Sequence, residues 1–275
     1  MLHTLTDTAQ LVPLLQGGAQ PGPDMRAVAE EVPVAFVYNH ATYAVMMATP
    51  AALEDFAYGF SLTEGIVSHP SEIQGLDIVP HPNGVELRMD LAEHRLEALH
   101  KRRRRLAGPV GCGLCGIESL DAAMRSVCPV VSDASIAVPD IARAMTAMEA
   151  RQTLHRATHC AHAAGFWHRE AGMLAVREDV GRHNALDKLA GAVTRMALAP
   201  EAGAVVLTSR VSVEMVQKTA ALGTAILLAV SAPTATAIRL AEECGLTLIA
   251  GVRGNRYEVF TGAGRLRGEQ ACRLS

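Results

Sequence analysis

The chain has 275 residues, of which 49% are hydrophobic and 19% are charged, and its formal net charge is −3 at pH 7. A chain of this length folds into one or two domains and can bury a sizeable core. The apolar content excludes a mainly disordered protein. The near balance of charge argues against a protein that wraps duplex nucleic acid, because that role requires an extended basic face.

The first residues carry no cationic segment followed by an apolar one, so we expect no secretory signal. The longest uncharged stretch, 219–238, contains Gly223, Ser231 and Pro233; it predicts a buried strand with flanking helices rather than a membrane span. Six cysteines in 275 residues are far fewer than in a disulfide-stapled secreted domain. We therefore expect a cytoplasmic protein in which a close cysteine pair is catalytic or metal-binding.

The N-terminal third is predicted to be rich in strands. Residues 1–28 have little pattern and are expected to form a loose arm. Residues 31–38 and 41–47 are strand-like and flank a turn at Asn39 and His40, which predicts a hairpin. A second hairpin is expected around the Pro-Asn-Gly turn at 82–84.

A helix is expected between these two hairpins. Thr49 and Pro50 are predicted to be its N-cap and first residue, and Gly65 its end. Apolar residues at helical spacing define its buried face: Leu53, Phe56, Ala57 and Phe60.

The pattern of hydrophobic residues changes after Pro139. A helix through 141–148 and two neighbouring strands come first. Short apolar strands at 204–208, 225–230 and 246–250 then alternate with amphipathic helices. This alternation is typical of a sheet covered on both faces. The prediction is an α/β protein (α+β overall) with a loose arm (1–28), a β-rich domain (29–107), a flexible loop and helix (108–138) and a larger domain (139–275).

The sequence at 111–116, Gly-Cys-Gly-Leu-Cys-Gly, is the first candidate for chemistry. A helix is expected to follow it, and a basic run at 101–105 precedes it; both would stabilise the thiolates of Cys112 and Cys115. Accessible thiolates suit nucleophilic sulfur chemistry. Half of a zinc site is the rival interpretation. The same hexapeptide fits a dinucleotide fingerprint, but no apolar strand precedes it.

A second cluster lies at 155–162 and contains three histidines and Cys160. It could complete a metal site with the cysteine pair, or its members could occupy ordinary hydrogen-bonded positions. His168 and Glu170 match the first half of a zinc deaminase signature. The Pro-Cys-x-x-Cys half does not follow, so deamination is not expected.

Polar residues are dense where the predicted strands end. The segment 178–188 leaves a strand and opens a helix, and 208–210, 231–234 and 251–256 follow later strands. Hydroxyls, backbone amides and arginines gathered at such ends suit phosphate or pyrophosphate. The sequence therefore predicts a phosphate-binding crevice in the C-terminal domain.

Taken in order, these motifs resemble the formate dehydrogenase accessory sulfurtransferase family of the FdhD/NarQ type. The resemblance extends over nearly the whole chain after about residue 28. It rests on five ordered blocks and an Arg-Gly end: 49–66, 112–116, 178–188, 209–218, 231–234 and Val252-Arg253-Gly254.

The resemblance implies a sulfur carrier. Such proteins take persulfide sulfur from a cysteine desulfurase and pass it to the molybdenum cofactor, bis-molybdopterin guanine dinucleotide, for formate dehydrogenase. It also implies a cytidine deaminase-like three-layer C-terminal domain without the deaminase zinc, and a homodimer. No metal, nucleic acid or membrane span is expected.

By this resemblance Cys112 and Cys115 are the catalytic pair, with Cys112 favoured as the persulfide carrier. The cofactor-binding candidates are Gly251, Val252, Arg253, Gly254, Asn255, Arg256, Arg182 and His183. Two positions depart from the family pattern. Where the family usually has Thr-Gly-Gly-x-His, residues 158–162 read Thr-His-Cys-Ala-His, and Gly251 stands where Phe is common.

Two alternatives remain open from the residues. A structural or regulatory zinc protein would use Cys112 and Cys115 with members of the 155–162 cluster, and zinc analysis would reveal it. A cofactor chaperone with incidental thiols would still bind its ligand after loss of both cysteines.

Overall fold

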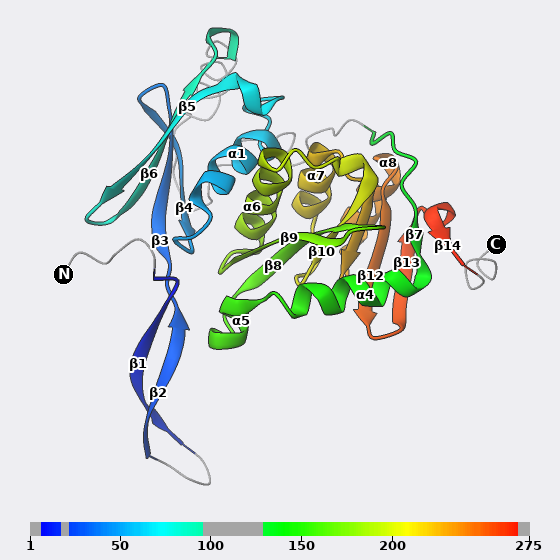
Figure 1. The fold of residues 1–275 in the computed structure, drawn as a ribbon, viewed down its shortest axis with the longest axis horizontal. Helices are drawn as coiled ribbons and strands as arrows, with labels where there is room; N and C mark the ends of the chain where they lie inside the picture. The colour runs from blue at the N-terminus through cyan, green and yellow to red at the C-terminus, as the bar shows by residue number, and fades with distance from the viewer. Residues whose placement is uncertain (1–6, 18–21, 96–128, 269–275) are drawn as a thin grey trace.

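The computed structural model describes residues 7–17, 22–95 and 129–268 (Figure 1). Its largest unit is a six-stranded sheet with the order β13-β12-β11-β10-β8-β9. β10, β11 and β12 are parallel, and β8, β9 and β13 are antiparallel to their neighbours. The strands are β8 (His162–His168), β9 (Gly172–Asp179), β10 (Gly203–Leu207), β11 (Ile226–Ala229), β12 (Thr247–Arg253) and β13 (Arg256–Thr261).

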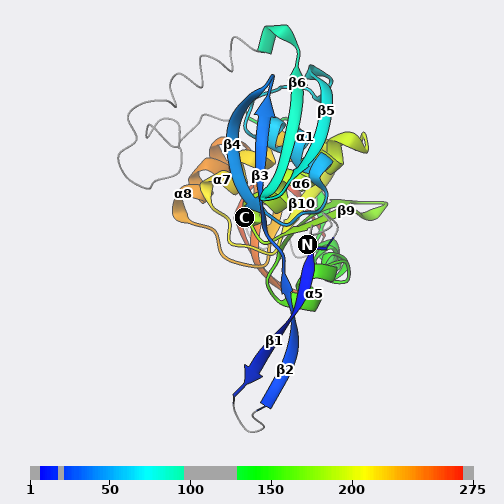
Figure 2. The ribbon, with the colours of Figure 1, turned by 90° about the vertical axis from the view of Figure 1, so that its left-hand side faces the viewer.

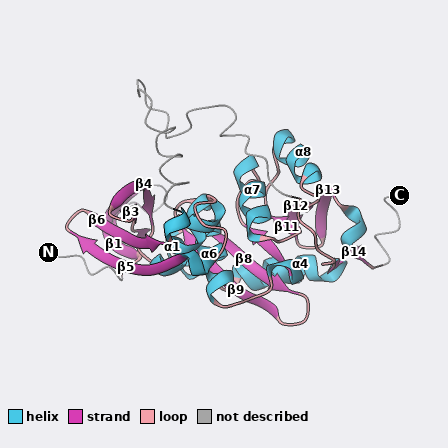
Figure 3. Cartoon of the chain, turned by 90° about the horizontal axis from the view of Figure 1, so that it is seen from above, coloured by secondary structure: helices cyan, strands magenta, loops and turns pink. Residues whose placement is uncertain are grey.

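Helices cover both faces of this sheet, as the alternation predicts. α4 (Val138–Glu149) lies on one face, and α6 (Arg182–Arg195), α7 (Val213–Leu222) and α8 (Ala235–Glu243) lie on the other (Figure 3). Along β10, Val205 and Leu207 pack toward α6–α8, and Ala204 and Val206 toward α4. The α/β class is confirmed, and the described helices pack on both faces of the sheet.

A smaller unit precedes the three layers. β3 (Val32–Tyr38), β4 (Ala41–Ala48), β5 (Ile73–His81) and β6 (Gly84–Leu91) form a sheet in the order β4-β3-β6-β5. α1 (Leu53–Thr63) packs its predicted apolar face on this sheet, where Phe36 and Phe60 stack with ring centroids 4.0 Å apart. Both predicted hairpins are present.

Short elements complete the described chain. α5 (Thr153–Thr158) precedes β8, and β7 (Ile136–Ala137) pairs with β14 (Leu266–Arg267). Single 3₁₀ turns span Pro70–Glu72, Pro200–Ala202 and Ala263–Arg265.

The predicted start of α1 is wrong. The helix begins at Leu53 after Ala52, and Thr49 does not cap it. The Thr49 amide instead donates to Asp179, 3.1 Å away, at the end of β9. A longer-range partner thus takes the residue that local capping rules assign to the helix.

The expected loose arm contains two strands in its described part. β1 (Ala9–Gln16) and β2 (Gly22–Ala29) pair with each other and project from the rest of the molecule (Figure 2). β1 shows little hydrophobic alternation, because Val12 and Leu14 place apolar side chains on the face opposite Leu11.

The two units meet through helices α1 and α6. A Cβ atom added at Gly59 would lie 1.7 Å from the carbonyl oxygen of Asp187, and one added at Gly191 would lie 1.8 Å from that of Asp55. The two glycines therefore allow the helix backbones to touch. No helix within the described ranges is long and apolar enough to cross a membrane.

Candidate functional site

The polar segments meet at one edge of the six-stranded sheet. This is the edge where β10, β11 and β12 end, and because β8 is antiparallel to β10 it is also where β8 begins. Thr208, just after β10, accepts a hydrogen bond from the Ala163 amide at 2.9 Å. β9 ends there as well, opposite His162, and leads into α6. The common placement predicted from the strand ends is confirmed.

Groups that carry or can carry positive charge cluster at this edge. His155 of α5, His162 of β8, and Arg182 and His183 of α6 are close enough to interact electrostatically. Burial, followed by the charges of Arg182, His155 and His183, lowers the pKa of His162. The imidazole is therefore neutral at pH 7 and can gain a proton when an anion arrives.

Two of the hydrogen-bond donors here have no partner in the described part of the chain. The Nε atom of Arg182 and the Oγ atom of Ser212 are both buried and unpaired. Arg182 is the first residue of α6, and Ser212 is the N-cap of α7, which its side chain does not cap. A helix N-terminus with free amide donors favours negative charge. The edge is thus suited to phosphate oxygens.

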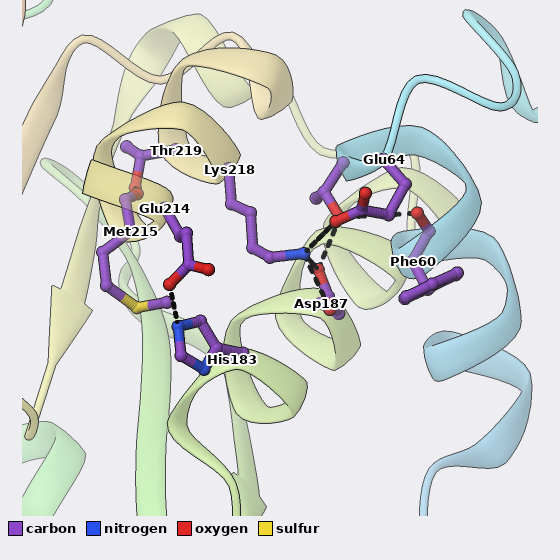
Figure 4. A network of polar contacts seen from close by, with 9 residues as sticks. Phe60, Glu64, His183, Asp187, Glu214, Met215, Lys218 and Thr219 are labelled. Atoms are coloured by element: carbon purple, nitrogen blue, oxygen red, sulfur yellow. Dashed lines mark hydrogen bonds and ion pairs between the residues drawn. The ribbon is translucent and has the colours of Figure 1, made fainter. Parts of the chain in front are cut away.

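A network of polar contacts lies beside this edge (Figure 4). The Nε2 atom of His183 lies 2.6 Å from a carboxylate oxygen of Glu214, and this contact lowers the pKa of Glu214. One turn further along α7, Lys218 donates to Asp187 at 2.8 Å and to Glu64 at 3.1 Å. The network joins the edge to the end of α1.

The 251–256 segment extends beyond the same edge as the hairpin between β12 and β13. Arg253 and Arg256 pair in register, and both are exposed. Neither has a carboxylate partner among the described residues. Gly251 has a φ of 63° at a bulge in β12, and Gly254 has a φ of 57° in the turn. The left-handed conformation favours glycine at both positions.

Two of the candidate residues in this segment differ in what they can contribute. Asn255 is exposed in the turn. Val252 is 2% exposed and packs in the core beneath α4, so only its backbone is available to a ligand.

Cys112 and Cys115 lie outside the described residues. The segment 158–162, which departs from the family pattern, lies within the described residues. His159 ends α5 with a φ of 56°, a backbone conformation that is typical of glycine. Cys160 beside it is exposed. No group of three His, Cys, Asp or Glu side chains in the described chain is placed to hold a metal ion.

The partial deaminase match lies elsewhere. His168 ends β8 at the opposite edge of the sheet. A cavity of about 530 Å³ lies there, lined in part by His168, Glu170 and Glu201. The deaminase half-motif is therefore separated from the cationic edge by the length of β8.

Asp179 and Lys188 were missed as individual residues in the sequence. Asp179 accepts hydrogen bonds from Gly181 at 2.8 Å, Asn184 at 3.0 Å and Lys188 at 2.6 Å, in addition to Thr49. Asp179 and Lys188 side chains are fully buried. Helical spacing gives a signal for this role, because positions 184, 187 and 188 share one face of α6.

Comparison with known proteins gives consistent results. A family model described as the FdhD/NarQ family matches residues 29–267. A protein of Agrobacterium fabrum named sulfur carrier protein FdhD is 55% identical over 247 residues, covering 90% of this chain and 91% of the relative. One of the same name from Cupriavidus necator is 50% identical, covering 88% and 84%.

A solved structure shares the fold. The crystal structure of a putative formate dehydrogenase accessory protein from Desulfotalea psychrophila superposes with a TM-score of 0.75. The sequence identity is 24%, and the match covers 95% of this chain and 100% of the other.

Proposed function

The chain belongs to the FdhD/NarQ family, and from this premise we propose that it is a sulfur carrier for the maturation of a formate dehydrogenase. Two relatives with 55% and 50% sequence identity to this chain are named sulfur carrier protein FdhD. The Cys-x-x-Cys pair at 112–115 supplies the thiols that this role requires.

Sulfur moves onto the chain by thiol exchange. The thiolate of Cys112 attacks the outer sulfur of a persulfide on a cysteine desulfurase. A new S–S bond forms on Cys112 as the donor S–S bond breaks, and the donor cysteine leaves as a thiolate, so no net oxidation occurs. This chemistry requires reduced cysteines, which agrees with a cytoplasmic location.

Delivery requires two electrons, because the outer sulfur must leave as sulfide. Cys115 can supply them: its thiol attacks the inner sulfur, the Cys112–Cys115 disulfide forms, and one sulfide is released. A pair of cysteines separated by two residues thus performs a step that one cysteine cannot. A cellular thiol reductant would then restore the pair.

The acceptor is proposed to be bis-molybdopterin guanine dinucleotide, bound as substrate at the cationic edge. The observation that supports this is the pair of buried donors at two helix N-termini, Arg182 Nε and Ser212 Oγ, which have no hydrogen-bond partner among the described residues. Arg253 and Arg256 extend from the neighbouring hairpin, where they can reach a second phosphate or the guanine. His183, held by Glu214, completes the edge.

Intact-protein mass tests sulfur carriage. The protein is incubated with a cysteine desulfurase and cysteine, alongside Cys112→Ala and Cys115→Ala. We expect a gain of one sulfur atom that reductant reverses and that Cys112→Ala abolishes. No gain in folded, metal-free protein would favour a binding-only chaperone, and no gain in protein with bound zinc would favour a metal site.

Calorimetry with guanosine diphosphate tests the binding edge. Arg253→Ala should weaken binding by about 10-fold, since a charge-assisted hydrogen bond contributes about 1.5–3 kcal/mol. Arg169→Met is the matched control, because Arg169 is exposed at the opposite edge. Equal affinity in all three proteins would remove the hairpin from the site.

A further inference from the structure

The cavity of about 530 Å³ lies at the edge of the six-stranded sheet opposite the cationic edge. Its size is within the range of small-molecule sites. Three segments line it: residues 131–135 ahead of β7, the end of β8 with the turn that follows, and the 3₁₀ turn ahead of β10. None of the candidate residues at the cationic edge belongs to this lining, so the cavity has no part in the function proposed above.

Hydrogen bonds hold the segments of the cavity together. The Ser132 hydroxyl donates to the carbonyl of Glu201 at 2.7 Å and accepts from the Ala134 amide at 3.0 Å. The guanidinium of Arg265 donates to the Ser132 carbonyl at 3.4 Å. The cavity is therefore formed by contacts of the chain itself, as is usual for ligand sites.

The lining of the cavity is rich in carboxylates. Each of the three segments contributes one, and the residues are Asp133, Glu170 and Glu201. All three residues are exposed, and their carboxylates have no ion-pair partner within the described ranges. They do not belong to any group of described side chains that is placed to hold a metal ion. The carboxylates therefore favour an organic cation, whose N–H groups can reach acceptors that are farther apart than metal ligands.

Hydrogen-bond donors lie beside these carboxylates. Trp167 lines a recess that shares three residues with the cavity, one of which is Arg169. Trp167 is 9% exposed, and its indole nitrogen is buried without a hydrogen-bond partner in the described chain. Nδ1 of His168 accepts amide hydrogen bonds at 3.3 and 3.2 Å in the following turn, so the ring donates from Nε2. These donors suit an acceptor group on a ligand, and a carboxylate suits a guanidinium best.

We propose that this cavity binds a free basic amino acid of the arginine or lysine type. The carboxylate of the ligand lies at Arg169 and the Trp167 recess. Its α-ammonium and its basic side chain lie among the three carboxylates of the lining. Because the lining has three carboxylates and one arginine, it favours a ligand with more positive than negative charge. Arginine and lysine meet this condition, since each carries two cationic groups and one carboxylate.

The lining also provides an apolar contact for a long side chain. Val131 is 93% exposed and lies at the cavity together with Ala134 and Ala202. The methylene groups of a lysine or arginine side chain can cover such a surface while the charged end stays in contact with polar groups. A small zwitterion such as glycine lacks this contact.

Intrinsic fluorescence tests the site, because Trp167 is the single tryptophan of the chain. Titration of the full chain with arginine should change the emission of Trp167 saturably, with a dissociation constant of about 1 mM or lower that calorimetry reproduces. Glu170→Gln with Glu201→Gln should raise this constant at least about 10-fold, because two charge-assisted contacts are lost. The matched control is Glu149→Gln with Glu242→Gln, two exposed residues outside the lining, which should bind arginine as the wild type does.

Two analogues of arginine test the two ends of the ligand. Agmatine lacks the carboxylate, and N-acetylarginine lacks the α-ammonium. Each should bind at least about 10-fold more weakly than arginine. Equal affinity for agmatine would contradict the role of Arg169 and Trp167. Equal affinity for N-acetylarginine would contradict a free amino acid and point to the C-terminal residue of a polypeptide.

Three further outcomes would overturn the site. They are no saturable change in fluorescence or heat up to about 10 mM arginine, equal affinity in the wild type and the Glu170/Glu201 double variant, and binding of glutamate as tight as that of arginine. Persulfide loading of the same samples separates this inference from the proposed function. Protein that binds arginine and takes up no sulfur would contradict sulfur carriage alone, and the reverse result would contradict this site alone.

Discussion

The segment 178–188 contributes to two regions of the molecule. In one region the buried charged groups are paired with each other, and in the other a buried charged group lacks a partner among the described residues. On the face of α6 toward α1, Lys188 is fully buried and paired with the fully buried Asp179 at the end of β9, and it also donates to the Thr49 carbonyl at 2.8 Å. At the start of the same helix, Arg182 carries a buried nitrogen with no partner among the described residues.

The difference separates structure from binding. A buried charge with all its hydrogen bonds made within the chain holds the two units together and has no capacity left for a ligand. A donor left unpaired at a helix N-terminus costs stability unless something else completes it. Density of polar residues alone does not distinguish these roles; partners do.

The largest expected effect is a loss of stability when the buried Lys188–Asp179 pair is broken. Lys188→Met leaves Asp179 buried without its cation, and breaking a buried pair in this way costs about 3–5 kcal/mol. Urea unfolding should show a midpoint shifted strongly downward. Arg182→Met should not lower the stability, because it removes an unpaired buried donor and breaks no ion pair among the described residues. Equal losses in the two variants would contradict the division of roles.

The next largest expected effect is a loss of ligand affinity when Arg182 is replaced. Arg182→Met should weaken guanosine diphosphate binding by about 10- to 100-fold, because it removes a charge-assisted contact to phosphate. Calorimetry on Arg182→Met and on Arg143→Met, a change of the same kind on α4, checks this. Binding that is unaltered by the first substitution would mean that the orphan nitrogen does not face the ligand.

A smaller effect concerns pH. Burial and the charges of Arg182, His155 and His183 lower the pKa of His162, and a bound phosphate should raise it again. Binding should therefore gain strength as pH falls from about 7 toward the pKa of the free protein, and lose that gain as pH rises. The difference between the wild type and His162→Gln isolates this effect, since the ligand's own titration is common to both. Parallel pH profiles would exclude His162.

The smallest effect concerns the departure at 158–162. His159 adopts a φ of 56°, which costs a side chain about 1–2 kcal/mol. Glycine avoids this cost but loses more conformational entropy on folding. The net effect of His159→Gly should therefore be a stabilisation of about 0.5–1 kcal/mol. Cys160→Gly is the control, since Cys160 does not have a positive φ. Thermal unfolding in which both variants lose stability would show that no strain is stored at His159.

Sequence patterns predicted the layers of sheet and helices better than the contacts between the two units. The short apolar strands and amphipathic helices each bury a face that local periodicity reveals, so the α/β sheet was predictable. The start of α1 was not, because Thr49 binds Asp179, 130 residues away in the sequence. The β1–β2 ribbon was missed because β1 shows little alternation and the alternation in β2 is limited to residues 24–27.

The candidate site was predictable in part for the same reason. Strand ends at a common edge follow from the order of elements, which placed Arg182, His183 and the 251–256 segment correctly on that edge. That Val252 is buried while its neighbours are exposed depends on the hairpin register. That the Ser212 hydroxyl finds no partner within the described residues depends on contacts that no local pattern encodes.

Transfer of sulfur in a single turnover tests the central claim most directly. The protein is loaded with one persulfide sulfur, freed of desulfurase, and mixed with the molybdenum cofactor, and its intact mass is followed over time. The account predicts that the wild type loses the sulfur when cofactor is added, and that loaded Arg182→Met retains it far longer. Discharge of Arg182→Met at the wild-type rate, or no discharge of the wild type, would contradict the account.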